Sequence, residues 1–305
     1  MAELILHHYD TSPFSEKIRK IFGFKRLAWR AVEQPSIMPK PDLLPLTGGY
    51  RRIPVLQVGA DIYCDTQVIT RTVERLHPSP TLYPRGSEGA CEVWALWADR
   101  QLFMTAVGAV FAEIGQFMPQ AFLDDRAKMA PGWRDYGKLA EAGPHAREQL
   151  RGLLGLVEAQ LADGRPYLLG EAFSLADAAV YHPRWFLRVA PQATALLTEF
   201  SHLVTWTERV EELGHGQRSE LTPAEALAIA RAAAPASTSS DDPGEPNQLR
   251  PGMHVTVTPD DYGFDPVRGE IVFSNLHEIA IRRHDDKVGD LVVHFPRLGF
   301  RVVGA

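Results

Sequence analysis

The chain passes from its first strand into its first helix at Thr11-Ser12-Pro13-Phe14-Ser15, the stretch that decides the fold. Proline is favoured at the first position of a helix, and serine is a good N-cap immediately before it. The apolar residues Phe14, Ile18, Ile21 and Phe22 then share one helix face. Residues 4–8 form a short apolar run typical of a buried strand. The start of the chain therefore predicts a strand followed by a capped helix.

The next 50 residues continue this pattern. Residues 29–33 suit a second strand, and residues 35–52 are rich in proline and glycine, so we expect irregular structure there. Two apolar runs, 53–58 and 61–64, flank Gly59-Ala60 and predict a hairpin. Asp65-Thr66 then starts a helix that ends before Pro78. The order β-α-β followed by β-β-α within residues 1–80 predicts a thioredoxin-like α/β domain.

The texture of the sequence changes twice after this domain. Residues 87–234 are helical in pattern, which predicts an all-α middle domain. Residues 235–249 are rich in Pro, Ser, Asp and Gly and predict a flexible linker. Residues 250–305 contain five short strand candidates and predict a small all-β, barrel-like domain. Together these segments indicate a multidomain chain.

Composition excludes several classes of function. The chain has 305 residues and a net charge of −6, so nothing favours a nucleic acid or an anionic membrane as partner. Its two cysteines form neither a disulfide framework nor a four-ligand zinc site, and we expect no metal. The N-terminus has an acid where a signal peptide has basic residues, and no apolar stretch is long enough to span a membrane. We expect a cytoplasmic protein.

Four motifs, in order along the chain, resemble those of cytosolic glutathione transferases. Ser12-Pro13-Phe14-Ser15 is similar to the start of the first helix in the serine-type members, with a likeness to the tau and zeta classes. Ile53-Pro54-Val55 resembles their cis-proline strand, and Asp65-Thr66 lies where they carry an acid followed by Ser or Thr. Ser174–Asp177 resembles the capping motif of their helical domain. The resemblance covers about 210 residues and leaves residues 250–305 outside it.

The resemblance implies a site for glutathione as co-substrate. Ser12 would donate a hydrogen bond to the glutathione sulfur and stabilise the thiolate, and Asp65 and Thr66 would bind the charged ends of the γ-glutamyl group. Val55, after a cis Pro54, would pair with the backbone of the cysteinyl residue. The full set of predicted glutathione-binding residues is Ser12, Phe14, Lys40, Ile53, Pro54, Val55, Asp65 and Thr66.

Each assignment has an alternative. Ser12 and Asp65 are also good N-caps with no further role, and Pro54 can be an ordinary trans residue of an edge strand. Tyr9 ends the first strand roughly where tyrosine-type relatives place their activating hydroxyl, which makes it the alternative to Ser12. Lys40 would bind the glycine carboxylate of glutathione, but it lies in an irregular, proline-rich segment, which favours a solvated surface lysine over this role.

The second substrate is not specified by the sequence. In the family the electrophilic acceptor lies between the two domains, where several residues at helical spacing could line a pocket or simply form core: Trp97, Gln101, Phe103, Met104, Val107, Phe111, Phe117 and Met118. We expect a homodimeric glutathione transferase that acts on a small electrophile. Two other hypotheses remain open: a non-catalytic protein that binds glutathione or apolar ligands, and a glutathione-dependent isomerase of a small dicarboxylate.

Overall fold

The chain begins with a β-α-β unit. In the computed structural model, which describes residues 3–130, 136–236, 239–240 and 242–304, β1 (Ile5–His8) leads into α1 (Pro13–Phe24). The next strand, β2 (Ala28–Glu33), runs parallel to β1. Ile18, Ile21 and Phe22 are fully buried in the core that α1 shares with the sheet, so the predicted apolar face is the face that packs.

A hairpin and a second helix complete the N-terminal domain. A short helix, α2 (Leu44–Thr47), interrupts the irregular segment before β3 (Val55–Val58) and β4 (Asp61–Cys64), which pair antiparallel across Gly59-Ala60. β3 also pairs antiparallel with β1, and α3 (Thr66–Leu76) follows. The predicted thioredoxin-like fold is confirmed.

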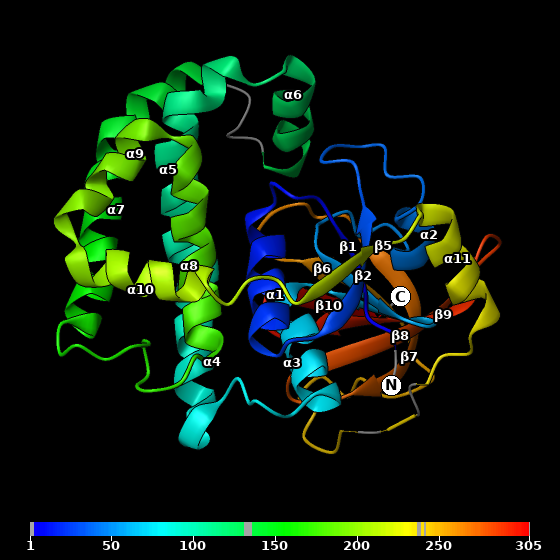
Figure 1. Cartoon of the computed structure of the whole chain (residues 1–305). Coiled ribbons are helices and arrows are strands. Elements are labelled where there is room, and N and C mark those ends of the chain that lie inside the picture. The colour runs from blue at the N-terminus through cyan, green and yellow to red at the C-terminus, as the bar shows by residue number, and fades with distance from the viewer. Residues whose placement is uncertain (1–2, 131–135, 237–238, 241, 305) are drawn as a thin grey trace.

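The helical domain stands beside this sheet, with α1 between the two (Figure 1). Its capping motif is present, since the Asp177 carboxylate accepts hydrogen bonds from the backbone N–H and the hydroxyl of Ser174. One turn, η2 (Ala98–Leu102), has π-helical hydrogen bonding. The other helices of the domain are α4 (Glu88–Trp97), α5 (Phe103–Ile114), α6 (Gln120–Met129), α7 (Tyr136–Leu161), α8 (Leu175–Phe186), α9 (Pro191–Ala195) and α10 (Ser201–Glu211).

The chain then returns to the N-terminal sheet. β5 (Gln217–Glu220) pairs parallel with β2, and α11 (Pro223–Ala232) begins with a capping box between Thr222 and Glu225. Ala226 of α11 packs with Ile5 and Val32. Residues 217–232, predicted as the end of the helical region, therefore lie on the α/β domain. The exposed residues of β5 have no apolar alternation, so the edge of β2 organises them as a strand.

The five predicted C-terminal strands are present and extend the same sheet. β6 (His254–Pro259), β7 (Val267–Ser274), β8 (Glu278–Asp285) and β9 (Gly289–Pro296) form an antiparallel meander, and β10 (Phe300–Gly304) returns to pair with β6. The Phe295 and Phe300 rings lie 5.6 Å apart across the turn between β9 and β10. We call residues 250–304 the C-terminal extension.

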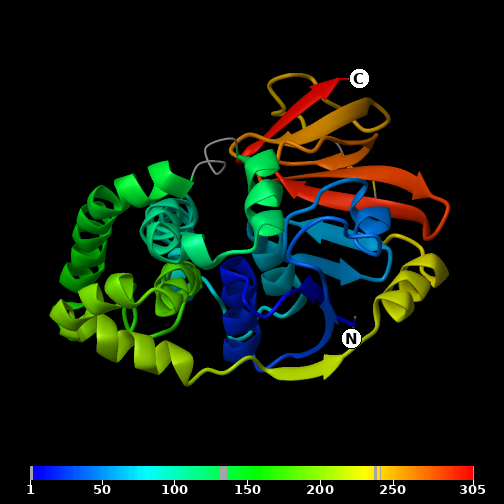
Figure 2. The same ribbon diagram turned by 90° about the horizontal axis from the view of Figure 1, so that it is seen from above.

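β9 joins the extension to the N-terminal domain by pairing parallel with β4, as the adjoining red-orange and blue arrows in Figure 2 show. The result is a single ten-stranded sheet in the order β10-β6-β7-β8-β9-β4-β3-β1-β2-β5. Val55 and Ile62 share one apolar core with Val293 and Phe295. The C-terminal strands therefore share both a sheet and a core with the thioredoxin-like domain.

The segment predicted as a linker, 235–249, makes contacts where the structure describes it. Ser240 forms a β-bridge with Phe273. The buried Glu245 carboxylate accepts hydrogen bonds from the backbone of Asn247 and Leu249 and from Arg297. These contacts hold the described part of the segment against the extension, and a domain boundary at this point stays a prediction.

Candidate functional site

Ser12 occupies the N-cap of α1, as predicted. Its backbone is extended, its side chain is buried, and its Oγ accepts a hydrogen bond of 3.2 Å from the backbone N–H of Ser15. Among the described residues, none accepts a hydrogen bond from the Ser12 hydroxyl. The cap therefore uses a lone pair of Ser12 and leaves its proton available to a ligand.

A cavity of about 580 Å³ opens beside Ser12, between the N-terminal and helical domains. Tyr9, Ser12 and Phe14 line it from the N-terminal side. Six of the eight residues proposed from sequence for the acceptor pocket line it from the helical side: Phe103, Met104, Val107, Phe111, Phe117 and Met118. The other two, Trp97 and Gln101, do not line it, and Trp97 packs against Trp94 instead.

Five cationic side chains also line this cavity, and its described lining includes no Asp or Glu. Arg51 and Arg126 both contact the carboxylate of Asp125, and Arg52 contacts that of Asp261. The described contacts of the other two, Lys40 and Arg188, include no carboxylate.

Lys40 and Arg188 are the two cations of the cavity lining that form no ion pair with a described residue. Lys40 Nζ donates to the carbonyl of Pro35 over 2.6 Å, and burial, reinforced by the charges of Arg126 and Arg51, lowers the pKa of Lys40 to about 8. The Arg188 guanidinium stacks 3.2 Å from the centre of the Trp185 ring and is exposed. The wall is thus apolar with two cations that an anionic group could reach.

A smaller hollow of about 50 Å³ adjoins the first and collects the other predicted site residues. Ile53, Pro54, Asp65 and Thr66 line it, and the Ile53-Pro54 peptide is cis. Asp65 caps α3, with its Oδ1 accepting from the backbone N–H of Gln67 over 3.0 Å. Burial raises the pKa of the Asp65 carboxyl.

The two hollows together bring seven of the eight predicted glutathione-binding residues onto one continuous surface. Ser12 and Lys40 line the large cavity, Pro54, Asp65 and Thr66 the small one, and both Phe14 and Ile53 line the two. Val55 lines neither, because it is buried in β3 in register with His7 of β1 and Cys64 of β4. The alternative Tyr9 lines the large cavity.

Sequence reasoning missed a buried polar cluster behind this surface. Lys17 Nζ donates to Asp99 Oδ2 over 2.6 Å and to Thr66 Oγ1 over 3.3 Å, and His182 Nε2 lies 2.9 Å from Asp99 Oδ1. Burial opposes the charged carboxylate, but Lys17 and His182 outweigh it and lower the pKa of Asp99. The sequence signal for this cluster is Asp99 itself, an acid within a largely apolar region. Asp99 lies in the π-helical turn η2, and such turns are often found at functional sites.

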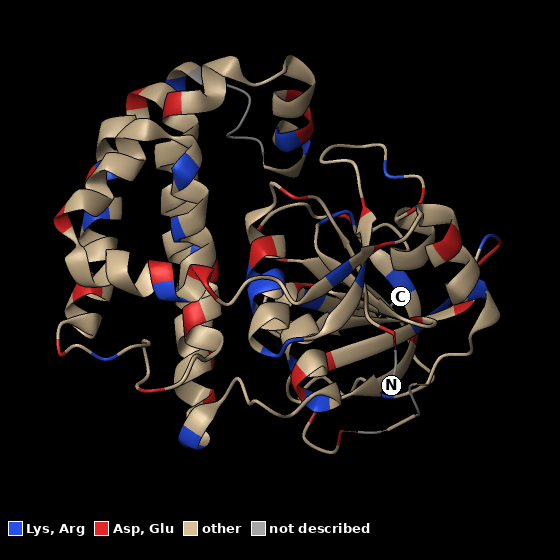
Figure 3. Cartoon of the chain, viewed as in Figure 1, with Lys and Arg blue, Asp and Glu red and all other residues tan. Residues whose placement is uncertain are grey.

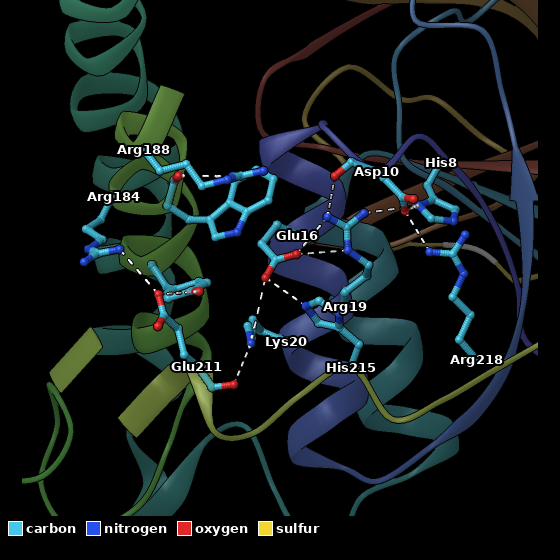
Figure 4. Close-up of polar contacts among 12 residues, drawn as sticks. His8, Asp10, Glu16, Arg19, Lys20, Arg184, Arg188, Glu211, His215 and Arg218 are labelled. Carbon is cyan, nitrogen blue, oxygen red and sulfur yellow. Dashed lines mark hydrogen bonds and ion pairs between the residues drawn. The ribbon is translucent and has the colours of Figure 1, made fainter. Parts of the chain in front are cut away.

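A second charged cluster holds the opposite side of α1 (Figure 4). Glu16 is buried and accepts from Arg19, while His215 Nε2 lies 2.9 Å from its other oxygen. Lys20 donates to the backbone carbonyl of Glu211 at the end of α10. Hydrogen bonds therefore fix the helix that carries Ser12 on both flanks. Figure 3 shows that acidic and basic residues are interspersed along the whole described chain, as they are in this cluster around α1.

Ligand atoms of His8, Asp10 and Glu33 approach one another within 4.8 Å, as a metal site would require. Two guanidinium groups lie against them, since Arg19 contacts His8 Nδ1 and Arg218 contacts Asp10. Figure 4 shows both cations at this position. Positive charge at the ligand atoms disfavours a metal ion here.

The C-terminal extension also reaches the site, which the sequence did not indicate. Tyr262 lines both hollows, and Asp261, Gly299 and Phe300 line the smaller one. These residues lie more than 190 positions after Asp65 and Thr66 in the chain.

No helix in the described residues is long and apolar enough to cross a membrane.

Comparison with known proteins identifies related sequences and folds. Residues 6–81 match the family profile of the glutathione S-transferase N-terminal domain, and residues 102–209 match that of the C-terminal domain. A GST-like protein from Pseudomonas syringae is 40% identical over 100% of both chains, with a TM-score of 0.84. No curated protein sequence matches the chain.

More distant structures share the fold alone. A tau-class glutathione S-transferase from mango is 18% identical, with a TM-score of 0.54 over 70% of this chain and 92% of its own. A rice enzyme whose structure contains glutathione is 20% identical, with a TM-score of 0.51 over 73% of this chain and 92% of its own.

Proposed function

Because this chain belongs to the glutathione S-transferase family, we propose that it binds glutathione and transfers it to a small electrophile, with Ser12 stabilising the thiolate. The observation that carries the proposal is the position of Ser12. Its hydroxyl caps α1, lines a cavity between two domains, and has no hydrogen-bond acceptor among the described residues. The chemistry then makes Ser12 a donor to sulfur and leaves the sulfur as the nucleophile.

The energy available at Ser12 is sufficient for this role. A free thiol has a pKa of about 8.5, and lowering it by about 2 units requires roughly 2.7 kcal/mol of preference for the anion. A hydrogen bond to a charged group contributes on the order of 1.5–3 kcal/mol. The N-terminus of a helix adds on the order of 0.3–1 kcal/mol. One hydroxyl at the start of α1 therefore accounts for the shift.

The remaining predicted residues fit the ends of the tripeptide. Asp65 offers an anion to the γ-glutamyl ammonium, and Thr66, at the N-terminus of α3, offers backbone N–H and hydroxyl groups to its carboxylate. Lys17, which is paired with Asp99, donates to Thr66 Oγ1 over 3.3 Å and holds that side chain in place. Lys40, in the large cavity, would bind the glycine carboxylate. In this arrangement the thiol lies near Ser12, between the two charged ends.

The acceptor substrate, in this proposal, is an apolar electrophile with an anionic group. Apolar side chains, nine of them phenylalanine or methionine, form most of the wall between the domains, and Lys40 and Arg188 add positive charge with no hydrogen-bonded carboxylate among the described residues. The same cations keep glutathione-dependent isomerisation of a small dicarboxylate as a second candidate, because that reaction requires a basic pocket. The comparisons favour neither this reaction nor a non-catalytic role.

Calorimetry and turnover together test the proposal. We expect glutathione to bind and to be consumed with at least one member of a panel of aromatic and unsaturated electrophiles. Binding without turnover over the whole panel would support the non-catalytic alternative. Absence of binding at millimolar glutathione would remove the proposal entirely.

We also propose that the protein is a cytoplasmic homodimer. Cys64 and Cys91 are free, buried thiols, which suits a reducing compartment. The dimer is carried over from the family. Light scattering should give twice the chain mass of 33.9 kDa, and a monomer mass would contradict this part of the proposal.

A further inference from the structure

The loop that joins β6 to β7, residues 260–266, reaches from the C-terminal extension to both other parts of the molecule. We call it the β6–β7 loop. Asp261 and the carbonyl of Tyr262 accept hydrogen bonds from Arg52, which precedes the cis-proline strand, and the Arg52 guanidinium lies 3.8 Å from the centre of the Tyr262 ring. On the helical side, Gly263 donates to the carbonyl of Met129 at the end of α6, over 2.9 Å.

The turn between β9 and β10 is a second segment of the extension that contacts the other two domains. Leu298, in the turn between β9 and β10, accepts a hydrogen bond of 3.3 Å from Gln67 of α3. Gly299 accepts from the backbone of Asp260, and Asp260 contacts Arg100 of η2 over 3.1 Å. In Figure 2 the extension lies against the N-terminal domain beside α6. The smaller hollow is therefore bounded by the thioredoxin-like domain, the helical domain and the extension together.

The charges in this hollow match the head group of an amino acid. Three carboxylates, of Asp65, Asp99 and Asp261, and two guanidinium groups, of Arg52 and Arg100, line it. A head group carries one ammonium and one carboxylate. A volume of about 50 Å³ holds the few heavy atoms of such a group.

Of the three acids, Asp99 is already committed. Both of its oxygens are occupied, one by Lys17 and the other by His182. Asp65 uses Oδ1 to cap α3. Asp261 uses Oδ1 for Arg52 and for the backbone N–H of Tyr262, and its Oδ2 has no hydrogen bond to a described residue. Asp65 and Asp261 thus each keep an oxygen for a ligand.

We infer that the C-terminal extension completes the glutathione site within the same chain, with Asp261 and Asp65 together binding the γ-glutamyl ammonium. This inference rests on the proposed function. Arg52 positions Asp261 through their ion pair, and Tyr262 separates the head-group hollow from the acceptor cavity. The extension then has a role in ligand binding in addition to its place in the sheet.

A binding cycle between protein and ligand tests this contact. The probes are S-methylglutathione and its deamino analogue, in which the γ-glutamyl ammonium is replaced by hydrogen, measured by calorimetry with the wild type and Asp261→Asn. We expect loss of the ammonium to weaken binding to the wild type about tenfold or more. The Asp261→Asn variant should bind S-methylglutathione more weakly than the wild type by a similar factor. Its affinity for the deamino analogue should equal that of the wild type within about twofold.

Controls separate a ligand contact from a structural one. Asp290→Asn changes an exposed acid of β9 in the same extension and should leave both affinities unchanged. Should Asp261→Asn fail to fold, Asp261→Ser retains an acceptor for the Tyr262 N–H and takes its place. Equal weakening of both ligands, or unchanged binding of S-methylglutathione, overturns the inference while the proposed function stands. Failure of the wild type to bind S-methylglutathione at all would overturn the proposed function and this inference with it.

Discussion

Lys17 Nζ lies 2.6 Å from Asp99 Oδ2, in an ion pair that joins α1 of the N-terminal domain to η2 of the helical domain. Lys17 has no exposed surface, and His182 contacts the other oxygen of Asp99. The same lysine reaches Thr66 at the start of α3. Lys17 therefore links the helix that Ser12 caps both to η2 and to the start of α3, where Thr66 lies.

Replacing Lys17 by Met should destabilise the protein. The substitution leaves the Asp99 charge partly buried without its main partner, and breaking such a pair costs about 3–5 kcal/mol. Urea unfolding followed by circular dichroism measures the change. Arg151→Met is the matched control, because it removes the exposed pair with Glu199 and should leave the midpoint unchanged. A Lys17→Met midpoint equal to that of the control would contradict the expectation.

Glutathione affinity should fall as Lys40 loses its proton. Burial lowers the pKa of Lys40 to about 8, so the ammonium is largely charged at pH 6.5 and mostly neutral at pH 8.5. We expect S-methylglutathione, which has no titrating thiol, to bind about fourfold more weakly at the higher pH. In Lys40→Met the affinity should be lower and should change less over this range, since only the γ-glutamyl ammonium of the ligand still titrates there.

The control for this pH dependence is Lys287→Met, which removes an exposed lysine of the extension. It should retain the wild-type pH profile. An unchanged profile in Lys40→Met as well would show that Lys40 does not bind the glycine carboxylate.

Arg188 should favour acceptors that carry a negative charge. We compare chlorodinitrobenzene with its carboxylated analogue, chlorodinitrobenzoate, in the wild type and in Arg188→Ala. Because Arg188 is exposed, we expect the ratio of kcat/KM for the charged over the neutral acceptor to fall by about threefold. Arg184→Ala changes an arginine of α8 that lies four residues before Arg188 and outside the cavity, and it should leave the ratio unchanged. A similar ratio in both variants would remove Arg188 from the acceptor site.

His294 should make the stability of the protein depend on pH. It lies between Glu278, at 2.5 Å, and Asp61, at 3.0 Å, where the extension joins β4. Burial alone would lower the pKa of His294, but its hydrogen bonds with Asp61 and Glu278 outweigh burial and raise the pKa above 6.5. The stabilisation is therefore complete below about pH 6.5 and is lost as the pH rises through the higher folded-state pKa.

Urea midpoints at pH 6.5 and pH 9 test this dependence. The wild type should lose stability at pH 9, and His294→Gln should lose less between the two values. His284→Gln changes an exposed histidine of β8 and should follow the wild type. If the urea midpoint of His294→Gln falls between pH 6.5 and pH 9 by as much as that of the wild type, the pH dependence of stability comes from other groups.

Local signals predicted much of this fold. Ser12 before Pro13, Ser174 before Asp177 and Thr222 before Glu225 each mark a helix start, because the chemistry of a cap lies within a few residues. The five C-terminal strands were also predicted, since each follows its own turn residues. These elements depend on short-range physics that a single sequence carries.

Pairings between distant segments could not be predicted in the same way. β9 pairs with β4 more than 200 residues away, and β5 is a strand only because the edge of β2 is beside it. The site shows the same limit. Asp99 and Asp261 carry no local motif, and only the folded chain brings them to the hollow beside Asp65. The role predicted for Val55 is a pairing of its backbone with the ligand, and its side chain belongs to the core.

Titration of bound glutathione by thiolate absorbance tests whether the Ser12 hydroxyl lowers the pKa of the glutathione thiol. We expect a thiol pKa about 1–2 units higher in Ser12→Ala than in the wild type, because a hydrogen bond to the anion is lost. Ser12→Thr, which keeps both hydroxyl and cap, should stay close to the wild type, as should Tyr9→Phe. An unchanged pKa in Ser12→Ala together with a raised pKa in Tyr9→Phe would contradict the account and assign the role to Tyr9.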